Sequence, residues 1–163
     1  MAAKKKKSAR KAVKKVAKKK APRRAAPRKK PRKKPETLRL RSIQPGFTVN
    51  DVHRSIAWYT NVLGFVLEEP WNRDGQLVGA ELRAGSCSIY LGQDDFAKGK
   101  DRVKGLGVRL YCETAQDLDA LAATVKARGG QLDHEPVTQP WGSRDFGITD
   151  PDGYRITVQL VAR

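Results

Sequence analysis

The chain has 163 residues, with 34 Lys/Arg against 17 Asp/Glu and a formal net charge of +17. This length predicts one domain with an appendage. Residues 1–35 hold 19 Lys/Arg and no acid, whereas the other 128 residues hold 15 Lys/Arg and all 17 acids, so the domain is near neutral. No stretch approaches the ~18 apolar residues of a membrane span, and no apolar stretch follows the N-terminal charges. The composition therefore argues against a membrane-spanning protein and against an N-terminal secretory signal.

Residues 1–35 form a Lys/Arg/Ala/Pro-rich tail of low complexity, followed by a linker at 36–41. The tail has too few apolar residues for their burial to offset the conformational entropy lost on folding. We therefore predict that it is disordered. Its cations should bind nucleic acid by releasing counterions, without reading sequence. The tail has no aromatic residue to stack on bases. The cations assigned to this contact are Lys4, Lys5, Lys6, Lys7, Lys14, Lys15, Lys18, Lys19, Lys20, Arg23, Arg24, Arg28, Lys29, Lys30, Arg32, Lys33 and Lys34.

The tail composition resembles the C-terminal tails of linker histones and bacterial histone-like proteins. Alternatives are a solubilising tail, an expression artefact, a start codon assigned too early, or attraction to a membrane surface. RNA is an alternative to DNA. The predicted location is the cytoplasm, with nucleoid association if the tail binds DNA.

The domain reads as one order of elements repeated twice. The first half predicts a strand at Ile43–Val49 and a helix capped by Asn50 or Asp51, with an apolar stripe and a terminal Gly64. Three strands follow, at Phe65–Glu68 before Pro70, at Gln76–Arg83 and at Ser86–Leu91.

After a link at Gln93–Gly105, the second half repeats this order. It predicts a strand at Leu106–Cys112, a helix opened by a capping box from Thr114 to Asp117, and a strand at Gln131–Glu135. A hairpin around Asp150-Pro151-Asp152-Gly153 supplies the last two strands. The fold class is therefore α+β, with the order βαβββ twice.

Cys87 and Cys112 both fall in predicted strands. Two buried free thiols are expected rather than a disulfide, and their spacing does not suit a zinc site.

The duplicated order and two stretches resemble the vicinal oxygen chelate superfamily, which includes glyoxalase I, bleomycin-resistance proteins, fosfomycin-resistance enzymes and extradiol dioxygenases. The stretches are VNDVHRSIAWYTNVLGF (49–65) and PWGSRDFGITDPDGYRITVQ (140–159). The resemblance covers about residues 42–161. It implies a domain at 42–162 whose modules, 42–92 and 105–162, curve their sheets around a shared cup. Such cups are often completed or doubled by dimerisation, so a homodimer is expected, with the cup formed either within one chain or across the dimer.

Strand alternation predicts which side chains line that cup. One face of each central strand is apolar and should pack on the helices; the opposite face is polar or small. Two arginines there suit a polar or anionic small molecule. The predicted ligand-binding residues are Gln44, Thr48, Ser88, Tyr90, Arg109, Tyr111, Arg155 and Thr157, with Trp71 and Trp141 stacking at the rim or capping the core.

The resemblance places the metal ligands of metal-dependent relatives on Gln44, Tyr90, Gly107 and Thr157. A catalytic divalent site needs three or four N, O or S donors, which this set does not supply. No cofactor is therefore expected, although a divalent metal is not excluded. His53 and His134 are interpreted as an exposed helix residue and an edge residue rather than as ligands.

Glu81 and Asp145 fall on the cup face and are the candidates for a catalytic base, with pairing to arginine as the alternative. The leading prediction is a metal-free binder of a small polar or aromatic ligand, tethered to nucleic acid by its tail. The alternatives are a lyase or isomerase using these carboxylates or an atypical metal site, and a nucleic-acid-associated protein with a vestigial cup.

Overall fold

The computed structural model describes residue 38 and residues 40–161, so the predicted nucleic-acid residues of the tail lie outside the described part of the chain. Residues 40–163 form a unit of their own. Within the described residues, no helix is long and apolar enough to cross a membrane.

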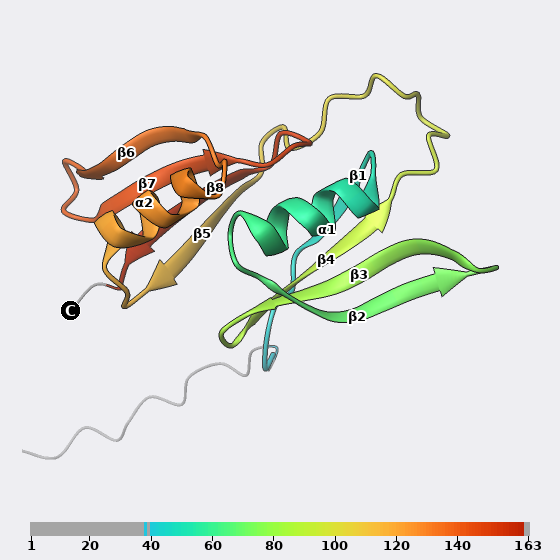
Figure 1. The fold of residues 1–163 in the computed structure, drawn as a ribbon, viewed down its shortest axis with the longest axis horizontal. Helices are drawn as coiled ribbons and strands as arrows, with labels where there is room; N and C mark the ends of the chain where they lie inside the picture. Colours follow the sequence, from blue (N-terminus) through green and yellow to red (C-terminus); the bar gives the residue numbers. More distant parts are fainter. Residues whose placement is uncertain (1–37, 39, 162–163) are drawn as a thin grey trace, which may run out of the picture. The chain divides into compact units, whose positions relative to one another are not determined.

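Two modules with the same element order make up this unit (Figure 1). The first contains β1 (Gly46–Val49), α1 (Val52–Asn61), β2 (Val66–Arg73), β3 (Gln76–Ala84) and β4 (Cys87–Gln93). The second contains β5 (Arg109–Thr114), α2 (Leu118–Ala127), β6 (Leu132–Thr138), β7 (Arg144–Thr149) and β8 (Arg155–Leu160). The sheets have the orders β1-β4-β3-β2 and β5-β8-β7-β6, and the first strand of each is parallel to its neighbour. The predicted α+β fold with two βαβββ modules is confirmed.

Several predicted boundaries are wrong. β1 and β5 begin three residues later than expected, at Gly46 and Arg109. β2 runs through Pro70 instead of ending before it, because β2 is an edge strand, where a residue without an N–H is tolerated.

Aspartates cap both helices. The Asp51 carboxylate accepts a hydrogen bond from the Arg54 N–H at 3.0 Å, and Asp117 accepts from the Ala120 N–H at 3.0 Å. The capping box predicted from Thr114 is therefore wrong, since Asp117 is itself the N-cap residue.

The turn between β7 and β8 joins the second module to α1. The Tyr59 hydroxyl donates to Asp150 Oδ2 at 3.0 Å, and the Ser55 hydroxyl donates to Asp152 Oδ2 at 3.1 Å. The Asn50 N–H donates to Asp152 Oδ1 at 2.8 Å, which puts a carboxylate at the positive end of the α1 dipole. We call this set of contacts the turn–helix joint.

Asp150 also organises its own turn, because its Oδ1 accepts from the N–H groups of Asp152 and Tyr154. Burial raises the pKa of the Asp150 carboxyl, while its hydrogen bonds from Tyr154, Tyr59 and Asp152 lower it. Burial and the neighbouring Asp150 both raise the pKa of Tyr59, so this phenol stays a donor.

The two modules share one hydrophobic core. Its buried members include Leu82 and Leu91 from the first sheet together with Ile148 and Ile156 from the second. Tyr59 lies within this cluster and is fully buried. Residues of both modules therefore pack in one cluster, while Leu118, Ala122 and Phe146 form a second cluster within the second module.

The link between the modules is fixed at both ends. Asp94 is buried and accepts charge-assisted hydrogen bonds from Arg102 at 2.7 Å and from the buried Lys104 at 2.6 Å. Lys104 also donates to Asn50 Oδ1. Next to it, a Cβ on Gly105 would lie only 2.1 Å from the Gly153 carbonyl oxygen, so the link packs directly on the β7–β8 turn.

Cys87 and Cys112 are both free thiols. The prediction that both are buried is wrong for Cys87, which is exposed because it starts β4 beside a tight turn. Burial raises the pKa of the Cys112 thiol.

Substituting Tyr59→Phe removes the donor to Asp150 and leaves a buried carboxylate oxygen unpaired. We expect the free energy of unfolding to fall by about 1–3 kcal/mol, measured by chemical denaturation. Tyr111→Phe is the matched control, because this phenol is 67% exposed and should change nothing. Equal stability of the two variants would contradict the role of the joint.

Lys104 and Arg102 hold the pKa of Asp94 well below its ordinary value of 3.8. A lowered folded pKa means that this carboxylate stabilises the fold above its ordinary pKa and loses that contribution as pH falls through the folded value. We expect Asp94→Asn to lower the melting temperature at pH 7, and the difference from the parent protein to shrink below about pH 4. A difference independent of pH would show that the charge is not what matters.

Candidate functional site

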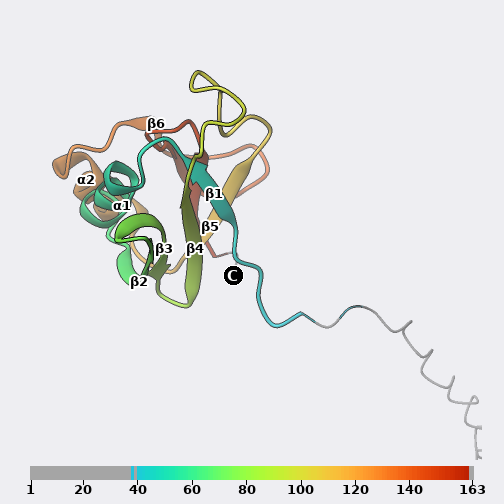
Figure 2. The same ribbon diagram turned by 90° about the vertical axis from the view of Figure 1, so that its right-hand side faces the viewer.

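Each sheet has one face that packs on helices and one that does not. In Figure 2 both helices lie to one side of the central strands β1, β4 and β5. We call the opposite surfaces the helix-free faces. Alternation and register assign to them Thr48, Gly79, Glu81, Ser88 and Tyr90 in the first sheet, and Arg109, Tyr111, Glu113, Asp145, Gly147, Arg155, Thr157 and Gln159 in the second.

The predicted apolar faces are largely buried. Phe47, Val49, Ile89, Leu91 and Ile156 are at most 4% exposed. Cys87 and Val108 do not follow this prediction, because Cys87 opens β4 and Val108 precedes β5, so neither lies under a helix.

An aromatic pair covers the helix-free face of the first sheet. The Trp71 indole lies over Gly79, where a Cβ would be only 2.6 Å from the ring, and meets the Tyr90 ring edge-on at a centroid distance of 5.3 Å. Trp71 is therefore a mid-strand residue of β2 rather than a residue at a strand entrance. Glu81 faces Tyr90 across the ladder and is partly exposed. Among the described residues, no arginine pairs with Glu81.

Two arginines lie side by side on the second sheet. Arg109 of β5 and Arg155 of β8 are register partners, and both are exposed. The Arg109 guanidinium donates to the hydroxyl of Thr157, which is buried, at 3.0 Å. Tyr111, next on the same strand face, is 67% exposed. This part of the face offers two guanidinium groups and a phenol to an anionic or planar molecule.

Asp145 is the most enclosed carboxylate of the helix-free faces, at 3% exposure. Its oxygens accept hydrogen bonds from the Gln139 amide at 2.8 Å and the Ser143 hydroxyl at 3.2 Å. The Trp141 indole N–H in turn donates to Ser143 Oγ at 2.8 Å. The alternative that Asp145 pairs with an arginine is wrong. Arg144, the adjacent arginine, pairs with Asp119.

His134 belongs to the same constellation, which the sequence analysis missed. Its ring lies over Gly147, where a Cβ would be 2.9 Å away, and its Nε2 is 3.6 Å from Asp145 Oδ1. The signal was present in the sequence, because alternation within β6 and a glycine on the neighbouring strand leave room for a ring on this face. His53, by contrast, is exposed on α1, as predicted.

A cavity of about 800 Å³ lies where β5 and β8 end. Two residues of the helix-free face, Glu113 and Gln159, line this cavity. The Gln159 amide donates a hydrogen bond to the Glu113 carboxylate at 3.3 Å. Trp141 and Ser143 form part of its wall, and Trp141 is 75% exposed. The predicted rim tryptophan therefore stands at an open cavity rather than in the core.

The remaining predicted ligand residues are dispersed. Gln44 is exposed and precedes β1, while Thr48 and Ser88 lie on the helix-free face of the first sheet. The structure thus brings Arg109, Arg155 and Thr157 together, pairs Trp71 with Tyr90, and leaves Gln44 outside the strands.

The residues at the family's metal positions do not fit a divalent metal. Gln44, Tyr90, Gly107 and Thr157 supply one amide, one neutral phenol, one hydroxyl and one position without a side chain. Within the described residues, no group of three or more His, Cys, Asp and Glu could hold a metal ion.

Comparisons with known proteins agree with this architecture. The family model for the Glyoxalase/Bleomycin resistance protein/Dioxygenase superfamily matches residues 41–158. No curated protein matches the chain.

Solved structures with the same fold come from several bacteria. TnmS3, an antibiotic binding protein from Streptomyces, is 22% identical over 77% of this chain and 100% of its own, with a TM-score of 0.59. A glyoxalase/bleomycin resistance protein/dioxygenase from Nocardioides is 19% identical over 76% of this chain and 85% of its own, with a TM-score of 0.60. An integron cassette protein from V. cholerae is 25% identical over 77% of this chain and 100% of its own, with a TM-score of 0.56.

The matched family model spans most of the chain, and the two βαβββ modules have the sheet order described above. The chain belongs to the Glyoxalase/Bleomycin resistance protein/Dioxygenase superfamily.

Proposed function

We propose that this protein binds a small aromatic molecule with an anionic group on its helix-free faces, using side chains rather than a metal. The observation that supports this most is the register pair of Arg109 and Arg155, two exposed guanidinium groups on neighbouring strands. Bidentate hydrogen bonding from arginine suits carboxylates and phosphates.

Aromatic side chains supply the second half of the recognition. Trp71 and Tyr90 form a surface for stacking on the first sheet, and Trp141 offers another at the 800 Å³ cavity. A cavity of that volume is in the range of drug-sized ligands. TnmS3 is an antibiotic binding protein with this fold, which favours sequestration of such a compound here.

A homodimer is part of this proposal. Within the described part of the chain, β1 and β5 are edge strands whose outer sides are unpaired, and Tyr111 of β5 is largely exposed. A second copy that covered these faces would enclose the ligand and remove exposed strand edges.

The tail would hold the binding domain on nucleic acid in the cytoplasm. Its 19 Lys/Arg without a single acid suit phosphate contacts that do not depend on sequence. Sequestration close to DNA is the role that combines the two parts of the chain.

A second candidate function is acid–base catalysis at Asp145. This carboxylate is nearly enclosed, its orientation is fixed by Gln139 and Ser143, and His134 lies 3.6 Å away. A carboxylate or an imidazole in such a position can act as a general base once a substrate proton comes within hydrogen-bond reach.

Ligand binding is tested by thermal shift of the full-length protein against a panel of anionic aromatic metabolites and antibiotics. A true ligand at a hundredfold excess over its Kd should raise stability by about 2.7 kcal/mol. Arg109→Gln and Arg155→Gln should each weaken that ligand at least tenfold, because each removes a charge-assisted hydrogen bond.

Arg128→Gln is the matched control, an exposed arginine at the end of α2 away from the helix-free faces. A ligand recovered chemically unchanged supports binding, and a product that disappears in Asp145→Asn supports catalysis instead. Binding that survives both arginine substitutions would refute the proposed recognition.

Tethering is tested by titrating duplex DNA with the full-length protein and with residues 36–163. Contacts to six or more phosphates should weaken binding roughly 10³-fold between 50 and 200 mM salt, equally for unrelated sequences. The shortened protein should lose this binding. DNA affinity that persists without residues 1–35 would place the contact on the domain.

A further inference from the structure

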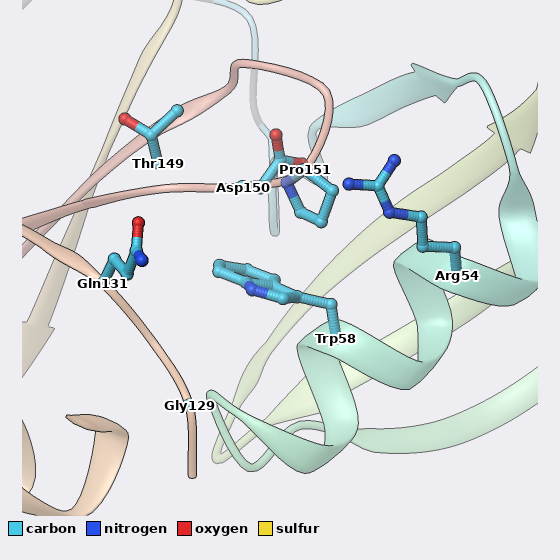
Figure 3. Close-up of a pocket in the computed structure, with 7 residues that line it drawn as sticks. All are labelled: Arg54, Trp58, Gly129, Gln131, Thr149, Asp150 and Pro151. Carbon is cyan, nitrogen blue, oxygen red and sulfur yellow. The ribbon is translucent and has the colours of Figure 1, made fainter. Parts of the chain in front are cut away.

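A second, smaller cavity lies between the modules, beside the turn–helix joint. Its volume is about 260 Å³. In Figure 3 the Trp58 indole lies between Gln131 on one side and Arg54 on the other, with Asp150 and Pro151 above the ring. Its lining residues are Arg54, Trp58, Gly129, Gln131, Thr149, Asp150 and Pro151.

The groups that this cavity offers to a ligand are hydrogen-bond donors. Arg54 is exposed, and among the described residues neither its guanidinium nor the Trp58 indole N–H has a side-chain or backbone acceptor. The Gln131 amide adds two more donors and one acceptor. The single accessible charge is therefore the Arg54 cation.

The acidic and hydroxyl groups of the cavity are already engaged. The Asp150 carboxylate is held by three donors and is only 4% exposed. The Thr149 hydroxyl donates to Asp133 at 2.8 Å. Both groups already have hydrogen-bond partners, and Asp150 presents little of its surface to the cavity.

We propose that this cavity is a second ligand site, for small planar carboxylates such as aromatic acids. The ring would lie on the Trp58 indole, the carboxylate would accept hydrogen bonds from Arg54, and a polar substituent would reach Gln131. Aromatic stacking and a guanidinium–carboxylate contact are the two interactions that this lining can make.

The position of the site gives it a consequence for the whole domain. Arg54 and Trp58 belong to α1, whereas Gln131, Thr149 and Pro151 belong to the second module. A ligand bound here contacts both modules next to Tyr59 and Asp150. Binding should therefore stabilise the joint between the modules, and the inference is independent of binding at the helix-free faces.

The test uses benzoate as the probe and the full-length protein. Binding is followed by two-dimensional NMR of the three tryptophan indole N–H signals, assigned by single Trp→Phe variants. We expect a saturable shift that is largest for Trp58. Acetate lacks the ring and benzyl alcohol lacks the charge, so both should bind at least tenfold more weakly.

Arg54→Gln should weaken the benzoate response of Trp58 at least tenfold, because it removes the one cation among the lining residues. Arg73→Gln, at an exposed arginine of β2, is the matched control and should leave the titration unchanged. Trp141→Leu should also leave the Trp58 response unchanged, since the Trp141 ring belongs to the 800 Å³ cavity.

Three outcomes would overturn the proposal. They are the absence of a saturable Trp58 shift, a Trp58 shift that survives Arg54→Gln, and a Trp58 shift that is lost in Trp141→Leu. The last would place benzoate on the helix-free side, which would leave the ligand proposal for those faces standing.

Discussion

The hydrogen bond from Tyr59 to Asp150 is the contact on which the arrangement of the two modules depends. Asp150 closes the β7–β8 turn through its own backbone hydrogen bonds, and the same carboxylate holds the phenol of α1 inside the shared core. Asp152 adds a carboxylate at the start of α1, where the helix dipole favours it. One four-residue turn therefore sets the position of the second module against the first.

The turn–helix joint and the hydrophobic core lie on the helix side of the sheets. Most side chains on the helix-free faces therefore contribute little to the stability of the fold. Arg109, Arg155 and Tyr111 are exposed and contribute little buried surface to the core. Asp145 and Thr157 are exceptions, since both are buried on these faces and both are hydrogen-bonded. Function can change on such faces without loss of the fold.

The sequence predicted the element order and most of the face assignment, because alternation and helical periodicity are local properties. It could not place His134 against Asp145, since that contact depends on irregular pairing of β6 with β7 and on the space above Gly147. It also missed the burial of Lys104, because only tertiary contacts bring Asp94 and Asn50 to this ammonium. The cavity at Trp58 has the same origin, as its walls come from two modules far apart in the chain.

The link at residues 94–105 also affects whether two copies of the chain could exchange modules. In proteins built from two equivalent modules, a slack connection allows one chain to exchange a module with another copy. Here Asp94 at the start of the connection pairs with Arg102 and Lys104 near its end, and Gly105 packs on the backbone of Gly153. Exchange of a module would require the buried Asp94–Lys104 pair to separate, so these contacts of the link oppose it.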